Sequence, residues 1–164
     1  MISSPFGKDL GSMNVDLENY TYYQMNNIDS NASTLRAGIT EIAENYGYDD
    51  IKININSQFG EDQMPMEVTV DGVSMVPTLQ DGENVIIQKN KKNPKVGDII
   101  VVKDPEETLL IKRLGNISGD RIFLSSDNND TVTAIVNGSY VEMIALEKWT
   151  NASNVVGVAK IFNV

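Results

Sequence analysis

The sequence contains no cysteine and no histidine. The absence of cysteine excludes disulfides, thiolate metal sites and cysteine nucleophiles. The absence of histidine removes the usual zinc ligand and the usual general base of hydrolytic enzymes. A catalytic site in this chain must therefore be built from Lys, Asp, Glu, Tyr or Ser, and we expect no metal and no cofactor.

Positive charge and long apolar runs are also scarce. The chain has 13 Lys and Arg against 23 Asp and Glu, a net charge of −10, whereas proteins that bind nucleic acids cluster Lys and Arg on one face. The one dense basic run, Lys89–Lys95, is short and rich in Asn, which is typical of a solvated turn. No apolar run approaches the length of a membrane span, and no targeting segment is visible at the N-terminus. We therefore expect no nucleic-acid partner.

The N-terminal part of the chain predicts a small α/β unit. Residues 1–13 are set aside as a tail, and residues 14–32 show no clear period and are predicted to be irregular. Residues 33–46 carry apolar side chains at helical spacing, with Ser33 or Ser30 available as N-cap and Gly47 as the stop. In residues 51–56, Ile alternates with Lys and Asn, which predicts a half-buried strand. Residues 14–65 therefore form the predicted N-terminal α/β subdomain.

Residues 66–164 predict a mainly β domain. Short runs rich in Val, Ile and Leu are separated by clusters of Gly, Pro, Asn and Asp, which favours antiparallel sheets arranged as a sandwich or a partly open barrel. The sequence VNGS at residues 136–139 predicts a tight hairpin turn. Residues 141–150 fit either a helical turn or a strand.

Ser74 lies in the stretch VDGVSMVPTL, directly after a predicted strand and the turn Asp71-Gly72. Pro77 disfavours the α region for the residue before it, so the segment after Ser74 is extended or turned. A serine there can project its hydroxyl from the end of a strand while its backbone N–H stays exposed, as a nucleophile that also stabilises an oxyanion requires. A serine that only satisfies a turn explains the same local pattern.

Lys112 is the lysine with the most apolar setting. It lies in TLLIKRLG, and strand alternation places Leu110, Lys112 and Leu114 on one face. A lysine in water has a pKa near 10.4, and burial without a carboxylate partner lowers it, because desolvation disfavours the ammonium. Lys112 is therefore a candidate general base, although an edge strand protected by a lysine would give a similar pattern.

Taken together, several motifs resemble successive boxes of the type I signal peptidases. The motifs are VDGVSMVPTLQDGENVIIQK, VGDIIVVKDP, LIKRLGNISGD, SSDNN and VVGVAKI. That family consists of membrane-associated serine proteases with a Ser–Lys dyad. The resemblance implies that Ser74 is the nucleophile and Lys112 the general base. It further implies a preprotein or peptide substrate with small residues before the cut.

The resemblance also implies where the protein works. It places the catalytic domain on the extracytoplasmic face of the cell membrane, with the anchor outside this chain. Six Asn-x-Ser/Thr sequons give weak additional support for an extracytoplasmic surface: Asn19, Asn31, Asn116, Asn129, Asn137 and Asn151.

Two departures from the bacterial pattern affect the supporting residues. Position 72 is Gly, so the hydroxyl that some members place there is absent, and the oxyanion rests mainly on the Ser74 N–H. The short SSDNN box resembles that of archaeal members and leaves Ser126 as the hydroxyl predicted to orient Lys112, with Asp127 as structural or electrostatic support.

The substrate is expected to add as a strand beside residues 66–73 or beside the strand near Lys112. Asp71, Val73 and Met75 are then the expected substrate-binding residues, and Met75 fits core packing equally well.

Two alternatives remain open. The Ser–Lys body also resembles the LexA-type self-cleaving repressors, which cut an Ala–Gly or Cys–Gly bond that precedes the nucleophile, and this chain contains Ala37-Gly38. That dipeptide lies inside the predicted helix 33–46, whereas a protease needs an extended scissile bond. The second alternative is a catalytically degenerate binding or scaffold module of the same fold. Ser74 Oγ within hydrogen-bond reach of Lys112 Nζ, together with a buried Lys112 that has no carboxylate partner, would favour an enzyme.

Overall fold

The computed structural model describes residues 10–89, 93–106 and 108–162. The chain divides into two compact units, Met1–Met66 and Glu67–Val164, which are described separately below. The described residues are mainly β with two helices, which confirms the fold class predicted from the sequence.

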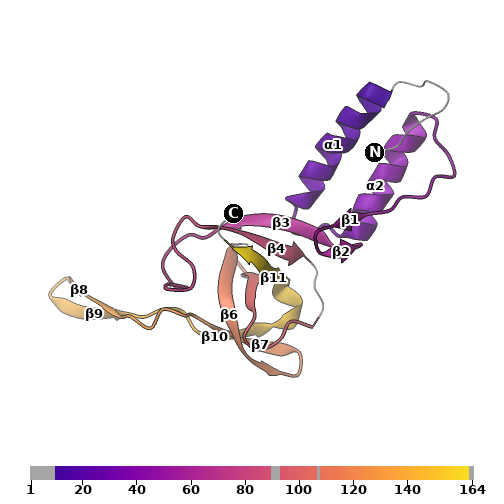
Figure 1. Cartoon of the computed structure of the whole chain (residues 1–164). Helices are drawn as coiled ribbons and strands as arrows, with labels where there is room; N and C mark the ends of the chain where they lie inside the picture. Colours follow the sequence, from indigo (N-terminus) through magenta and orange to yellow (C-terminus); the bar gives the residue numbers. More distant parts are fainter. Residues whose placement is uncertain (1–9, 90–92, 107, 163–164) are drawn as a thin grey trace. The chain divides into compact units, whose positions relative to one another are not determined.

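The first unit contains two helices, α1 (Leu10–Met25) and α2 (Ala32–Asn45), which pack on each other (Figure 1). The prediction that residues 14–32 are irregular is therefore wrong for 14–25 and for Ala32, whereas 26–31 are irregular as predicted. Helix α1 also begins inside the segment 1–13 that was set aside as a tail. Helix α1 buries only Met13 and Leu17, so its apolar face is too narrow to give a clear helical period.

Helix α2 was predicted from its apolar spacing and is confirmed within one residue at each end. Its N-cap is Asn31 rather than Ser30 or Ser33. The Asn31 side chain accepts from the Thr34 N–H at 3.0 Å, and Thr34 Oγ1 accepts from the Asn31 N–H at 2.9 Å, which completes a capping box. At the other end Gly47 has φ +86°, the left-handed conformation expected of a helix stop.

The prediction of a strand over residues 51–56 is wrong except at Asn56. Regular pairing begins at β1 (Asn56–Ser57), which pairs with β2 (Gly60–Glu61) in a small hairpin. Side-chain burial does alternate from Ile51 to Ile55. The alternation was therefore a correct indication of an extended backbone, but no neighbouring strand pairs with it.

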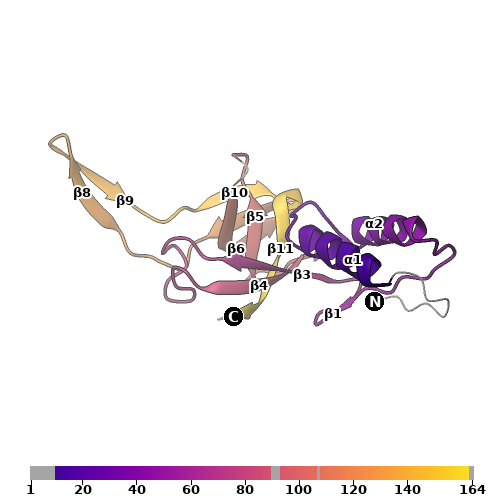
Figure 2. The ribbon, with the colours of Figure 1, turned by 90° about the horizontal axis from the view of Figure 1, so that it is seen from above.

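The second unit is built on a seven-stranded antiparallel sheet, shown in Figures 1 and 2, with strand order β10-β7-β6-β5-β11-β4-β3. Strand β3 carries the chain into this unit from the first. The strands are β3 (Met64–Thr69), β4 (Asn84–Lys89), β5 (Ile99–Lys103), β6 (Leu109–Ser118), β7 (Arg121–Ser125), β10 (Lys148–Asn151) and β11 (Val155–Phe162), with a 3-10 turn at Ala152–Asn154.

One apolar cluster fills one face of this sheet. Its fully buried members come from four neighbouring strands: Ile100, Val102, Leu114, Ile122, Leu124 and Val158. These residues occur at alternate positions along their strands, as expected when one face of an antiparallel sheet is buried. The cluster provides the rigid framework on which the side chains discussed below are mounted.

A second hairpin extends away from the sheet. Strands β8 (Val132–Val136) and β9 (Ser139–Met143) pair only with each other and are almost entirely exposed (Figure 2). Asn137 and Gly138, with φ +48° and +78°, form the tight turn predicted from VNGS. The ambiguous segment 141–150 contains the end of β9 and most of β10, so a strand is the better interpretation.

The basic run Lys89–Lys95 is only partly described, because residues 90–92 lie outside the described ranges. The prediction of a solvated turn is wrong for Lys89, which ends β4 and is 1% exposed. Lys95 is exposed, as predicted.

Candidate active site

Lys112 lies in the middle of β6, directly opposite Ile100 of β5. Its side chain is on the same face as Leu110 and Leu114, which pack in the apolar cluster, and the residue is only 5% exposed. Strand alternation therefore carries this lysine into the interior of the sheet rather than to solvent.

The Lys112 side chain is held by a short polar chain. Its Nζ donates a hydrogen bond to Ser126 Oγ at 3.1 Å, and Ser126 Oγ in turn donates to the Leu146 carbonyl at 2.8 Å. Because the Ser126 hydroxyl hydrogen is directed at Leu146, its oxygen is free to accept from Lys112. This arrangement fixes the orientation of the amine, and Ser126 is itself 5% exposed.

The electrostatic setting of Lys112 favours the neutral amine. Burial lowers the pKa of Lys112, and repulsion by the nearby Lys148 ammonium lowers it further. Across the described part of the chain, Lys112 forms no ion pair with Asp or Glu. A neutral amine keeps a lone pair that can accept a proton, which is the property a general base needs.

Ser74 lies in the turn that follows β3 and is half-buried. Its backbone carbonyl accepts from the Asn128 N–H at 2.9 Å, and the Val73 carbonyl accepts from Asn128 Nδ2 at 2.9 Å. Asn128 is two residues from Ser126, the partner of Lys112. These contacts bring the Ser74 backbone to the segment that orients the candidate base.

The hydroxyl and the backbone N–H of Ser74 are both available to a substrate. Among the described residues, neither Ser74 Oγ nor the Ser74 N–H makes a hydrogen bond, so there is no direct bond between Ser74 Oγ and Lys112 Nζ. A half-exposed serine with a free N–H can present both a nucleophile and an oxyanion donor to a peptide.

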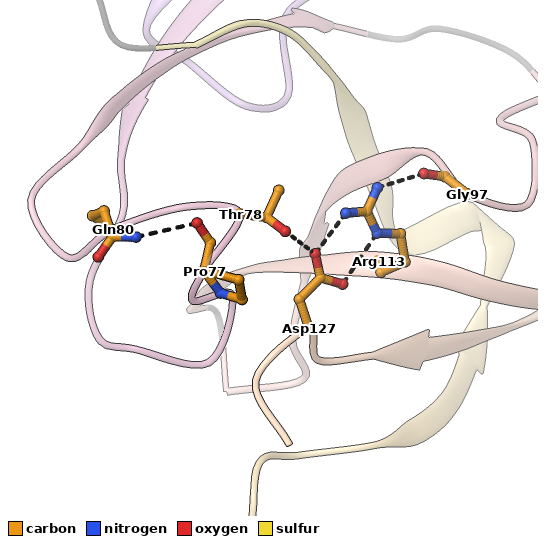
Figure 3. Close-up of polar contacts among 6 residues, drawn as sticks. All are labelled: Pro77, Thr78, Gln80, Gly97, Arg113 and Asp127. Carbon is orange, nitrogen blue, oxygen red and sulfur yellow. Dashed lines mark hydrogen bonds and ion pairs between the residues drawn. The ribbon is translucent and has the colours of Figure 1, made fainter. Parts of the chain in front are cut away.

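A polar clamp, formed by Thr78, Arg113 and Asp127, fastens the same turn to the sheet (Figure 3). Asp127 accepts from Arg113 Nε at 3.1 Å, from Arg113 Nη2 at 2.5 Å and from Thr78 Oγ1 at 2.5 Å, while Arg113 Nη1 donates to the Gly97 carbonyl at 2.7 Å. The Arg113 guanidinium, with help from Thr78, lowers the pKa of Asp127. Asp127 therefore connects the Ser74 turn with the residue that follows Lys112.

Gly72 contributes to the shape of the turn. Its φ of +97° is strained for a residue with a side chain, although an added Cβ would meet nothing within 4 Å. Its N–H donates to Asp81 Oδ1 at 2.8 Å. The N–H of Gly72 is therefore engaged, and that of Ser74 remains available.

The three expected substrate-binding residues differ in accessibility. Val73 is 60% exposed and Asp71 is exposed. Met75 is 0% exposed, so its side chain presents no surface to a ligand, and the packing interpretation holds instead of the pocket interpretation.

The dipeptide Ala37-Gly38 is helical, because it lies within α2. A Cβ at Gly38 would lie 1.9 Å from Tyr20 Oη, so this glycine permits the close approach of α1, and Tyr20 Oη donates to the Thr34 carbonyl at 3.1 Å. The packing of the two helices therefore gives a structural reason for the Ala–Gly pair.

Several residues of the site were not identified from the sequence. Thr78, Arg113 and Asn128 all lie inside the quoted motifs, which was the available indication, but their roles depend on contacts between segments far apart in the chain. Lys148 was missed because it lies in the segment whose structure was ambiguous.

No helix in the described ranges is long and apolar enough to cross a membrane. Within the same ranges, no three Asp or Glu side chains gather in a way that could hold a metal ion.

The part of the chain that contains this site matches a known protein family. The profile of the Peptidase S24-like family matches residues 31–146. Signal peptidase I of Bacillus licheniformis is 32% identical over 93 residues, which cover 54% of this chain and 47% of that protein. Signal peptidase I P of Bacillus subtilis subsp. natto is 36% identical over 77 residues, 44% of this chain and 39% of that protein.

A third relative, signal peptidase I V of Bacillus subtilis strain 168, is 33% identical over 79 residues, 46% of this chain and 44% of that protein. The chain thus spans about half the length of the curated relatives it matches or less, and all three are bacterial. Because the family profile covers well over half of the sequence, the chain belongs to the Peptidase S24-like family.

Proposed function

We propose that this chain is the catalytic domain of a signal-peptidase-like serine endopeptidase, with Ser74 as nucleophile and Lys112 as general base. The observation that carries the proposal is the state of Lys112. It is buried, bonded to Ser126 and without a carboxylate partner in the described ranges, in a chain that has no histidine.

In the proposed reaction, neutral Lys112 takes the proton of Ser74 Oγ while that oxygen attacks the carbonyl carbon of an extended peptide. The Ser74 N–H donates to the oxyanion of the tetrahedral intermediate. The Lys112 ammonium then protonates the leaving amine as the C–N bond breaks. Water, deprotonated by Lys112, hydrolyses the acyl-enzyme and regenerates Ser74.

The reaction requires a lysine that is neutral near physiological pH. Burial and the Lys148 charge both favour the neutral form. Ser126 can accept a hydrogen bond from either form of Lys112, so it orients the amine through the whole cycle.

The proposed substrate is a preprotein segment with small residues before the cut, by likeness to the signal peptidases. Strand β3 is the last strand in the order of the sheet, so its outer edge is not paired within that sheet. A peptide can add there as a further strand, and the exposed Val73 and Asp71 follow directly. We place this activity on the extracytoplasmic face of the membrane, with an anchor outside this chain.

Self-cleavage at Ala37-Gly38 is less compatible with the structure, since the bond is helical and several α2 hydrogen bonds would have to break before it could bind as a strand. The scaffold alternative predicts no cleavage of any peptide.

The test is cleavage of a synthetic peptide with a small-x-small site by the wild-type chain and by Ser74→Ala and Lys112→Met. Ser118→Ala and Lys160→Met, which change exposed residues on β6 and β11, are the matched controls. We expect cleavage to be lost in the first pair and kept in the second. Equal cleavage of the peptide by wild type and Ser74→Ala would disprove the proposal. So would an outcome in which the peptide stays intact and the chain itself is cut at Ala37-Gly38.

A further inference from the structure

The geometry points to Lys148 as a positioning residue that acts through Lys112: its charge, held by Asp104 on the same face of the sheet, adds to burial in favouring the neutral form of the general base. This inference rests on the proposed function and adds a residue to it. Lys148 Nζ lies 3.0 Å from Asp104 Oδ1, and both side chains are partly buried, with 34% and 19% of their surface exposed.

Strand register places Lys112 and Lys148 on one face of the sheet. Lys148 of β10 is opposite Leu124 of β7, and Leu124 is opposite Leu114 of β6. Directly opposed residues in antiparallel strands point to the same side, and so do residues two apart on one strand. Lys112 is two residues from Leu114 and therefore shares this side with Lys148.

Asp104 also belongs to this face of the sheet, but it follows β5, which lies on the other side of β6 from β7 and β10. Lys112 is opposite Ile100 of β5, and Asp104 continues the alternate series Ile100, Val102, Asp104 just beyond the end of that strand. In the strand order, β10 and β5 are three places apart, with β7 and β6 between them. In a flat sheet they would be about 14 Å apart at the usual strand spacing, so an ion pair of 3.0 Å requires the sheet to curl around this face.

Strand register relates Lys112 to the two partners of that ion pair. Lys148 is level with Leu114, whereas Asp104 follows Lys103, which is level with Leu109. Lys112 therefore lies, along β6, between the levels of Lys148 and Asp104. The Leu146 carbonyl, two residues before Lys148, is also the acceptor of the Ser126 hydroxyl, so the segment entering β10 contributes to the surroundings of Lys112 at two points.

The other charged groups near Lys112 are directed elsewhere. Lys103 is on the opposite face of β5 by alternation, Asp127 is paired with Arg113, and Asp81 accepts from the Gly72 N–H. Asp98, which is half-buried before β5, accepts from the Lys95 N–H through Oδ2. The other charged residues described on the neighbouring segments are exposed: Asp71, Glu106, Asp120, Arg121 and Glu147. Lys148 is accordingly the charge that adds to burial in lowering the pKa of Lys112.

The experiment measures the titration of Lys112 directly, by NMR of the chain labelled at the lysine side chains. Disappearance of one resonance in Lys112→Met assigns the signal. Lys148→Gln removes the positive charge and keeps a side chain that can donate a hydrogen bond to Asp104. Lys148→Arg keeps the positive charge. Lys160→Met is the control, because it removes one positive charge at an exposed site. Peptide cleavage is measured against pH for the same proteins.

We expect Lys148→Gln to raise the pKa of Lys112 by about 0.5 to 1 unit, the size of a charge interaction at a partly buried site. The acid limb of the cleavage profile should move to higher pH by the same amount, which lowers the rate on that limb about 3- to 10-fold. Lys148→Arg and Lys160→Met should leave both unchanged.

A second set of variants, made in the Asp104→Asn chain, separates the effect of the Lys148 charge from that of the Asp104 charge. Asp104→Asn removes the carboxylate that Lys148→Gln alone would leave unpaired, and adding Lys148→Gln to it should again raise the pKa of Lys112. The inference is wrong if Lys148→Gln raises the pKa of Lys112 neither in the wild-type chain nor in the Asp104→Asn chain, even if the peptide is cleaved. If no peptide is cleaved at all, the proposed function fails, whereas the NMR titration still shows whether Lys148 controls Lys112.

Discussion

The polar clamp around Asp127 makes a strong prediction about stability. Asp127→Ala removes two hydrogen bonds from Arg113, at 3.1 and 2.5 Å, and one from Thr78 at 2.5 Å. The Arg113 and Asp127 side chains are 31% and 16% exposed, so solvent screens the pair only in part. Taking about 1.5 to 3 kcal/mol for the charge-assisted pair and about 1 kcal/mol for the threonine bond, and allowing for screening, we expect a loss of about 2 to 4 kcal/mol.

The pH dependence gives this prediction a second, independent part. The pKa of Asp127 is lowered in the folded protein, chiefly by its hydrogen bonds from Arg113. A carboxyl whose folded pKa is depressed contributes stability that is fully present above its unfolded pKa, near 3.9, and is lost as the pH falls through the folded pKa. The free energies of unfolding of wild type and Asp127→Ala should therefore converge in acid.

The assay is urea unfolding of the full chain at pH 7 and at steps down to pH 3, followed by circular dichroism. Thr78→Val is the matched control, because it removes one hydrogen bond and leaves the ion pair, and it should cost about 1 kcal/mol at pH 7. A loss below about 0.5 kcal/mol for Asp127→Ala at pH 7, the range of an ordinary surface substitution, would refute the clamp. So would a difference from wild type that does not change with pH.

Further variants test other parts of the structure. Lys112→Met should raise the free energy of unfolding at pH 7, because burial disfavours the charged lysine in the folded protein. The gain should shrink as the pH rises from the lowered folded pKa of Lys112 to its unfolded pKa. Above the unfolded pKa, the wild-type amine is neutral in both states. Asn128→Ala should reduce kcat for peptide cleavage while Lys112 titrates as before, because it removes the side-chain bond to the Val73 carbonyl and loosens the Ser74 turn without changing the base. Asn31→Ala should destabilise α2 by about 1 kcal/mol in thermal unfolding. Gly38→Ala should lower the melting temperature, because the clash with Tyr20 outweighs a gain of about 1 kcal/mol in helix propensity.

The features that the sequence predicted well are those set by local patterns. The strands of the second unit, helix α2 and the turn at Asn137-Gly138 follow from alternation, helical spacing and residues that tolerate positive φ. The errors arose where a local pattern was too weak or lacked a partner. Helix α1 buries two residues and shows no clear period, whereas Ile51–Ile55 alternate in burial without a strand to pair with.

The candidate site shows the same division. The apolar setting of Lys112 could be read from its own strand, because alternation fixes the face on which a side chain lies. The partners of that lysine could not, since Ser126, Leu146 and Lys148 come from later segments and only strand register brings them together. Residue types at fixed spacing predict a strand and its face, but not which distant loop supplies a hydrogen-bond acceptor.

One short segment, Ser126–Asp127–Asn128, connects the candidate base with the candidate nucleophile. Ser126 accepts from Lys112, Asp127 holds Arg113 and Thr78, and Asn128 binds the backbone at Ser74. The Ser74 turn has no regular secondary structure of its own, so these contacts take the place of strand pairing in fixing it. A displacement of the segment would move the base and the nucleophile together, which explains how a turn can keep a defined position relative to a lysine 38 residues further along the chain.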